Sequence, residues 1–172
     1  LTIFIGIAEE FLCRGWLQNE FIERYGDTKK HIVLSLLFSS LIFGLIHFSN
    51  MLAGQDLFTT IVQVIQATSA GLLLGSIYYK TKNIWAVIFL HSIYDFCLMI
   101  GDLNLIKDCT FNTPTTGIVL YNTFSTLVLS AINIVGALLV LKRTNLKDGT
   151  KVIDKNDKRL VSMLITLFVV LM

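Results

Sequence analysis

The feature that most constrains this chain is a series of apolar runs, most of 17 to 25 residues, separated by short polar segments. A helix rises about 1.5 Å per residue, so roughly 20 apolar residues cross a hydrocarbon core about 30 Å thick. Five such runs, the first of them partial, cover Leu1–Trp16, Ile32–Phe48, Leu57–Tyr79, Ile84–Ile100 and Gly117–Leu141. A sixth run begins near Leu160 and stops with the chain. The pattern is typical of a protein that crosses a membrane several times.

The composition supports this class of protein. Hydrophobic residues form 54% of the 172 residues and charged residues only 15%, whereas soluble domains carry about 25% charged residues. Backbone polar groups in lipid must be paired within the protein, which favours helices. We therefore predict an all-α, polytopic transmembrane helical bundle with five spans plus a truncated sixth. We expect residues 1–172 to form a single transmembrane domain, truncated at both ends because the chain begins and ends inside apolar runs.

Basic residues are distributed unevenly between the predicted loops. Loops 19–31, 80–83 and 142–159 hold twelve Lys and Arg residues, whereas the loops on the opposite side hold only Lys107. The positive-inside rule places the first group of loops in the cytoplasm, next to anionic membrane lipids. The net charge of +2 gives no indication of nucleic-acid binding, and three cysteines support no disulfide framework.

Six ionisable residues lie inside or beside the apolar runs, where each costs about 2.5–3.5 kcal/mol or more unless it faces protein or water. They are Glu9, Glu10, Arg14, His47, His91 and Asp95. Three pairs are four residues apart and share a helix face, namely Glu10 with Arg14, Phe43 with His47, and His91 with Asp95. Their spacing predicts one buried polar cavity, in which carboxylates and imidazoles bind and activate a water molecule. A carboxylate in such a cavity binds a proton more readily than in water, which suits a general base.

These residues also form three ordered motifs on successive apolar runs. Glu9-Glu10-Phe11-Leu12-Cys13-Arg14 matches EExxxR, Phe43-Gly44-Leu45-Ile46-His47 matches FxxxH, and His91-Ser92-Ile93-Tyr94-Asp95 matches Hxxx(N/D). In this order they resemble the CPBP (Abi, CAAX-protease) family of intramembrane endopeptidases. The resemblance covers roughly Ile3 to Met99.

The resemblance implies peptide-bond hydrolysis within or at the edge of the membrane. In a bacterial member this is the cell membrane. Eukaryotic members cleave prenylated proteins, and bacterial members are linked to peptide maturation and bacteriocin immunity. By position, Glu9 is the general base and His47 helps to hold the water. His91 and Asp95 steady the tetrahedral intermediate or a proton. Glu10, Arg14, Phe43 and Asn50 are supporting residues, with Glu10 and Arg14 bracing their helix.

The sequence leaves open whether a metal ion takes part and what Asp95 does. The family is often labelled as metalloproteases, and Zn²⁺ held by His47 and His91 with Glu9 or Asp95 is an alternative to metal-free glutamate catalysis. HExxH is absent, and the candidate ligands come from three separate runs. The prenyl-protease branch usually has Asn where this chain has Asp95. An ionised aspartate cannot donate to an oxyanion, so His91 would donate, or Asp95 would be protonated or orient His91.

The predicted substrate is a hydrophobic, lipid-anchored or prenylated peptide. The main alternative is a non-catalytic immunity or scaffold protein on the same fold, which would still function after Glu9→Ala. An ion-coupled transporter is the third class, but the runs show no internal repeat and no intramembrane proline.

Overall fold

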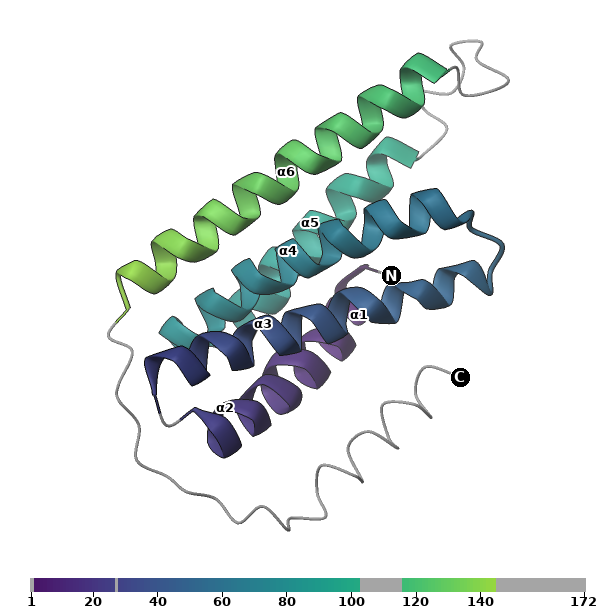
Figure 1. Ribbon diagram of the computed structural model, residues 1–172. Helices are drawn as coiled ribbons and strands as arrows, with labels where there is room; N and C mark the ends of the chain where they lie inside the picture. Colours follow the sequence, from purple (N-terminus) through teal and green to yellow (C-terminus); the bar gives the residue numbers. More distant parts are fainter. Residues whose placement is uncertain (1, 27, 103–115, 145–172) are drawn as a thin grey trace.

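The computed structural model describes residues 2–26, 28–102 and 116–144, and all regular secondary structure in these ranges is helical (Figure 1). The elements are α1 (Thr2–Glu10), the π-helix η1 (Phe11–Gln18), α2 (Asn19–Tyr25), α3 (Lys29–Ile46), the 3₁₀-helix η2 (His47–Met51), α4 (Leu57–Thr81), α5 (Ile84–Asp102) and α6 (Thr116–Lys142). The prediction of an all-α protein is confirmed.

Three of the described helical segments are long and apolar enough to cross a membrane, Lys29–Met51, Leu57–Thr81 and Val119–Lys142. Ile84–Cys97 is also apolar but shorter. These helices indicate an integral membrane protein. The count of five spans and a sixth stays a prediction, because the first helical run does not meet the same criteria. The run near Leu160 lies outside the described residues.

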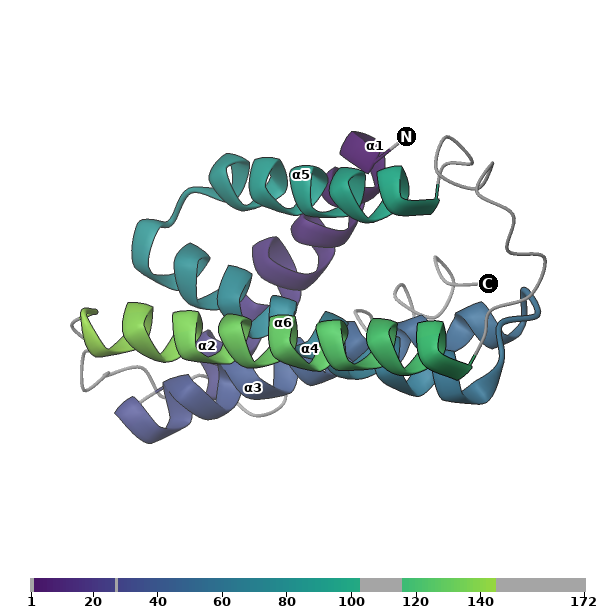
Figure 2. The ribbon, with the colours of Figure 1, turned by 90° about the horizontal axis from the view of Figure 1, so that it is seen from above.

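Helix α4 is central to the arrangement. Helices α3 and α6 pack along it and form one layer, while α1 and α5 pair in a second layer (Figures 1 and 2). The π-helix η1 contacts helices of both layers. π-Helical segments are rare and are frequently found at functional sites. Here the segment directly follows Glu9 and Glu10 and contains Arg14.

The first predicted loop differs from the structure. Residues 19–31 were expected to form a loop, but helix α2 extends the first helical run as far as Tyr25. An ion pair of 2.5 Å between Arg24 and Glu20, four residues apart, stabilises this extension. The Asn19 side chain also donates to the Gly15 carbonyl and to the Tyr78 hydroxyl, which ties the start of α2 to α4.

Two residues of η1 bind the backbone of α4 in matching register. Arg14 donates to the Gly71 carbonyl at 3.1 Å, and Gln18 donates to the Gly75 carbonyl at 3.0 Å. A Cβ at Gly71 would lie 3.2 Å from the Arg14 guanidinium, and one at Gly75 would lie 2.6 Å from the Gln18 amide oxygen, so the absence of a side chain at both positions leaves room for these bonds. The small residues therefore let a charged and a polar side chain reach the carbonyls of a neighbouring helix.

Helices α3 and α4 approach each other closely at Gly44. A Cβ there would lie 2.8 Å from the Val64 carbonyl oxygen and would also overlap the Thr68 hydroxyl. Since the backbone of α4 cannot move aside as a flexible side chain can, the position excludes larger residues.

We expect Gly44→Ala to destabilise the protein by about 1–3 kcal/mol, the usual range for overpacking. The check is the thermal unfolding midpoint of the purified protein in detergent. Gly15→Ala is the matched control, because its Cβ would meet no atom closer than 3.6 Å. Equal midpoints for the two variants would show that the contact between α3 and α4 is not as tight as described.

Candidate active site

The structure brings the three sequence motifs together from separate elements. The end of α1 and the π-helix η1 supply Glu9, Glu10 and Arg14. The junction of α3 and η2 supplies Phe43 and His47, and α5 supplies His91 and Asp95. The π-helix contacts helices of both layers at this point.

A fully buried carboxylate, that of Glu10, lies at the centre of the cluster. Its Oε1 atom accepts from Arg14 Nη1 at 2.6 Å and from His91 Nδ1 at 2.7 Å. The Arg14 guanidinium also lies over the Phe43 ring, 4.5 Å from its centroid. The predicted pair of Glu10 and Arg14 is therefore present, but it does more than brace one helix, because Glu10 also binds α5.

The His91 ring connects three carboxylates. Its Nδ1 faces Glu10, and its Nε2 lies 3.5 Å from both Glu9 Oε2 and Asp95 Oδ2. Glu9 and Asp95 are partly exposed, at 33% and 24%, whereas His91 is buried. An imidazole nitrogen between two carboxylates is stabilised when a proton is shared among the three groups. The arrangement can therefore hold and move a proton next to Glu9.

His47 and Phe43 line the same cavity as His91. His47 Nδ1 lies 3.0 Å from the Phe43 carbonyl oxygen, and the Phe43 ring stands edge-on to both His47 and His91. Phe43 thus packs between the two histidines and separates them. Asn50, predicted as a supporting residue, donates its amide to Gln63 of α4 at 2.9 Å, and Gln63 lines the polar cavity beside these groups.

A polar cavity of about 90 Å³ adjoins these groups, enough for a few water molecules. It is lined by Phe43, His47, Gln63, Gln66, Ala67, Ala70, His91, Tyr94 and Asp95. Gln66 donates to the Tyr94 hydroxyl at 2.6 Å across α4 and α5. Tyr94 was not among the predicted site residues. Its position three residues after His91, and so on the same side of the helix, was the available signal.

An apolar groove of about 250 Å³ also adjoins Glu9. It is lined by Ile5, Ala8, Glu9, Leu12, Cys13, Phe43 and Ile46. Glu9 lines this groove and is also 3.5 Å from His91, which lines the polar cavity. One partly exposed carboxylate therefore stands at the boundary between an apolar and a polar hollow.

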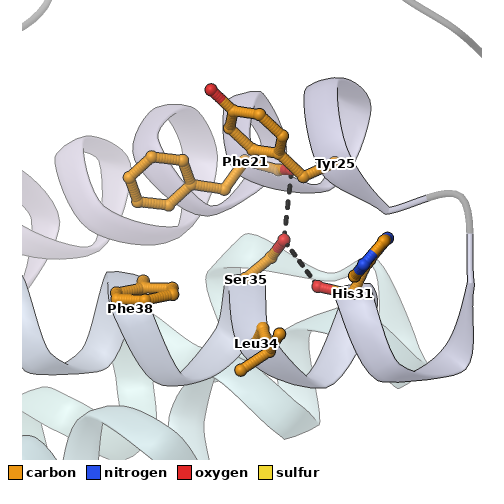
Figure 3. A pocket seen from close by; sticks show the side chains of 6 residues that line it. All are labelled: Phe21, Tyr25, His31, Leu34, Ser35 and Phe38. Atoms are coloured by element: carbon orange, nitrogen blue, oxygen red, sulfur yellow. Dashed lines mark hydrogen bonds between the residues drawn. The ribbon is translucent and has the colours of Figure 1, made fainter.

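A larger pocket of about 320 Å³ lies between α2 and α3 and contains none of the predicted site residues (Figure 3). It is lined by Phe21, Tyr25, His31, Leu34, Ser35 and Phe38. Its buried hydroxyl, that of Ser35, donates to backbone carbonyls of Phe21 and His31. The smaller polar cavity, which is lined by His47, His91 and Asp95, is therefore the candidate active site.

The positions of the same side chains bear on whether they could hold Zn²⁺. The described ranges contain no group of three or more His, Cys, Asp or Glu side chains placed to hold a metal ion. One nitrogen of each histidine is already bonded, Nδ1 of His47 to a carbonyl and Nδ1 of His91 to Glu10. These bonds leave Nε2 of each ring free, as in metal-binding histidines, so the lack of fit to a metal ion rests only on the placement of the described side chains.

A known protein family matches the part of the chain that carries the three motifs. The family model described as type II CAAX prenyl endopeptidase, Rce1-like, matches residues 1–97. No curated protein and no solved structure matches the chain. The matched segment is more than half of the 172 residues and includes all three motifs. The chain therefore belongs to the Rce1-like family of type II CAAX prenyl endopeptidases.

Proposed function

We propose that this protein is an intramembrane endopeptidase in which Glu9 activates a water molecule for attack on a peptide bond. The observation that carries the proposal is the position of Glu9. Its carboxylate lines an apolar groove and lies 3.5 Å from His91, which lines the adjacent polar cavity. A hydrophobic substrate in the groove and a water molecule in the adjacent cavity can therefore both approach this carboxylate.

The proposed reaction has two steps. Water in the polar cavity gives one proton to Glu9 while its oxygen bonds to the substrate carbonyl carbon, and the C=O electron pair moves to the carbonyl oxygen. The C–N bond then breaks as the C=O bond re-forms, and the leaving amine takes the proton from Glu9. The products are a carboxylic acid and an amine, and Glu9 is regenerated.

The neighbouring side chains support this proton transfer. His47 lines the polar cavity and holds the attacking water, and Phe43 keeps the His47 and His91 rings apart. His91 and Asp95 share a proton beside Glu9, since Nε2 of His91 lies 3.5 Å from both carboxylates. Glu10 and Arg14 hold His91 in place from the buried side.

The substrate class follows from the groove. Its walls are apolar apart from Glu9 and Cys13, which suits a hydrophobic, lipid-anchored or prenylated peptide that enters from the lipid. We place the protein in a bacterial cell membrane as a single domain over residues 1–172, with five spans and part of a sixth. Segments 19–31, 80–83 and 142–159, the first of which includes α2, face the cytoplasm in this proposal, in agreement with their basic residues.

Glu9→Gln keeps the shape of the side chain but removes its basicity, so we expect cleavage to fall at least 10²-fold. The assay is release of the C-terminal fragment from farnesylated and unmodified hydrophobic peptides by the full-length protein in liposomes, followed by mass spectrometry. Glu23→Gln is the control, because Glu23 is an exposed glutamate on α2. Wild-type rates in Glu9→Gln would remove Glu9 from the mechanism. No cleavage by any of the three proteins would favour the non-catalytic scaffold or immunity role.

Ala8→Phe places a ring in the apolar groove, so we expect kcat/KM for a lipidated peptide to fall roughly 10-fold, mainly through KM. Ala53→Phe adds the same ring at an exposed position between η2 and α4 and is expected to cleave normally. Michaelis–Menten kinetics on the three proteins are the check. An unchanged KM in Ala8→Phe would indicate that the substrate does not occupy this groove.

A further inference from the structure

The further inference concerns the pocket of about 320 Å³ between α2 and α3, which the proposed peptidase chemistry does not use (Figure 3). Aromatic and aliphatic side chains form most of its lining, namely Phe21 and Tyr25 from α2 and Leu34 and Phe38 from α3. A lining of this kind suits a hydrocarbon chain, which makes van der Waals contacts with it and needs no hydrogen bond.

Contacts within the protein hold this pocket in shape. The Ser35 hydroxyl on α3 lies 3.1 Å from the Phe21 carbonyl oxygen on α2 and 2.9 Å from the His31 carbonyl oxygen, so it joins the two helices (Figure 3). The Phe21 and Tyr25 rings pack on each other, with 6.5 Å between their centroids. The Ser35 hydroxyl is committed to these backbone groups, and the pocket is formed without a ligand.

The two ends of the pocket differ in polarity. In Figure 3 His31 lies at the end next to the connection between α2 and α3, and Phe38 lies at the other end. Seven residues separate them, which corresponds to about 10 Å along the helix. Lys30 precedes Leu34 by four residues, so it lies on the pocket side of α3, one turn nearer the start of the helix. Lys29 and Lys30 are both exposed, and the polar end of the pocket therefore lies within one turn of two lysines.

The start of α3 carries positive charge where a helix ordinarily favours negative charge. The N-terminus of a helix has a partial positive charge, which acidic side chains in the first turn stabilise. The first turn of α3 contains no acidic residue, and Lys29 and Lys30 occupy it instead. The cap is neutral, because the Thr28 hydroxyl accepts from the His31 N–H at 3.2 Å. This end of the helix is therefore complementary to an anion.

The acidic side chains of α2 do not neutralise this positive charge. Glu20 is paired with Arg24 at 2.5 Å. Glu23 is two residues from each of the α2 residues that line the pocket, so it lies on the opposite side of that helix. Asp27 lies outside the described residues. The described part of α2 thus leaves the two lysines available to a ligand.

An anionic phospholipid has the two chemical features that this site would recognise. We propose that the pocket binds one such lipid, with an acyl chain between α2 and α3 and its phosphate on Lys29 and Lys30. Basic pockets between helices at the cytoplasmic side of a membrane bind anionic headgroups, and both lysines belong to segment 19–31, which is basic as the positive-inside rule requires. The inference needs a membrane environment and does not depend on the peptidase mechanism.

Native mass spectrometry of the delipidated full-length protein in detergent tests the headgroup contact. The probes are dioleoylphosphatidylglycerol and dioleoylphosphatidylcholine, which have the same acyl chains but differ in net charge. We expect one phosphatidylglycerol per protein, with an apparent Kd at least about 10-fold below that of phosphatidylcholine. Lys29→Gln/Lys30→Gln should weaken phosphatidylglycerol binding roughly 10- to 30-fold. Lys142→Gln/Arg143→Gln is the matched control, because this adjacent basic pair is also exposed but lies outside the pocket, and its Kd should stay within about twofold of wild type.

A second pair of variants tests the acyl-chain contact. Leu34→Trp places a large ring in the pocket, and we expect it to weaken phosphatidylglycerol binding about 10-fold or more. Leu37→Trp adds the same ring at an exposed position of α3 outside the pocket and should bind the lipid normally. Thermal unfolding midpoints without lipid establish that both variants are folded. The headgroup without chains, glycerophosphoglycerol, is expected not to bind.

Four outcomes would overturn the inference. Equal affinity of the wild type for both lipids, or equal losses in the two basic-pair variants, would show only general attraction between charges. Wild-type affinity in Leu34→Trp would place the lipid outside the pocket. Displacement of phosphatidylglycerol by a farnesylated peptide would assign the pocket to the substrate. Absence of any phosphatidylglycerol complex would leave the pocket to another segment of the chain or to a second copy. Cleavage is not measured, so failure of the proposed peptidase function would leave these results unchanged.

Discussion

A carboxylate with no exposed surface, that of Glu10, joins the two layers of this protein. It accepts hydrogen bonds from Arg14 on the π-helix and from His91 on α5, and Arg14 in turn donates to the backbone of α4. Removal of one partner from a buried ion pair costs about 3–5 kcal/mol, because the remaining charge has no compensation. The position of His91 relative to Glu9, and therefore the proton-transfer chemistry, depends on this one group.

The second constraint is the separation of apolar and polar space by Phe43. Its ring lines both hollows, lies under the Arg14 guanidinium and stands edge-on to the two histidines. In a lipid environment a polar cavity persists only if its groups are bonded to protein or water. The aromatic wall allows an apolar groove to reach Glu9 without opening the whole cavity to lipid. This arrangement suits hydrolysis of a hydrophobic substrate, since water and substrate approach from different hollows.

Local relations at the site were largely predictable from the sequence. The pairs of Glu10 with Arg14 and His91 with Asp95 are four residues apart, and helix geometry alone brings such side chains together. The bond between Glu10 and His91 spans 81 residues, so no spacing rule could predict it. The position of Tyr94 in the cavity wall was missed for the same reason, because its hydroxyl is bonded to Gln66 of another helix. Residues 19–25 were misassigned to a loop because polar composition outweighed the helical spacing of Glu20 and Arg24.

The class of protein and the chemical groups available to it can be predicted from the amino-acid sequence. Long apolar runs in lipid must be helices, and ionisable residues within them must face one another or water, because exposure of their charge to lipid is too costly. Which atoms come into contact depends on how the helices pack in the tertiary structure. The register of η1 on Gly71 and Gly75 and the crossing of the two layers place three carboxylates around one imidazole. Such contacts depend on packing between distant helices, and periodicity along a single helix carries no information about them.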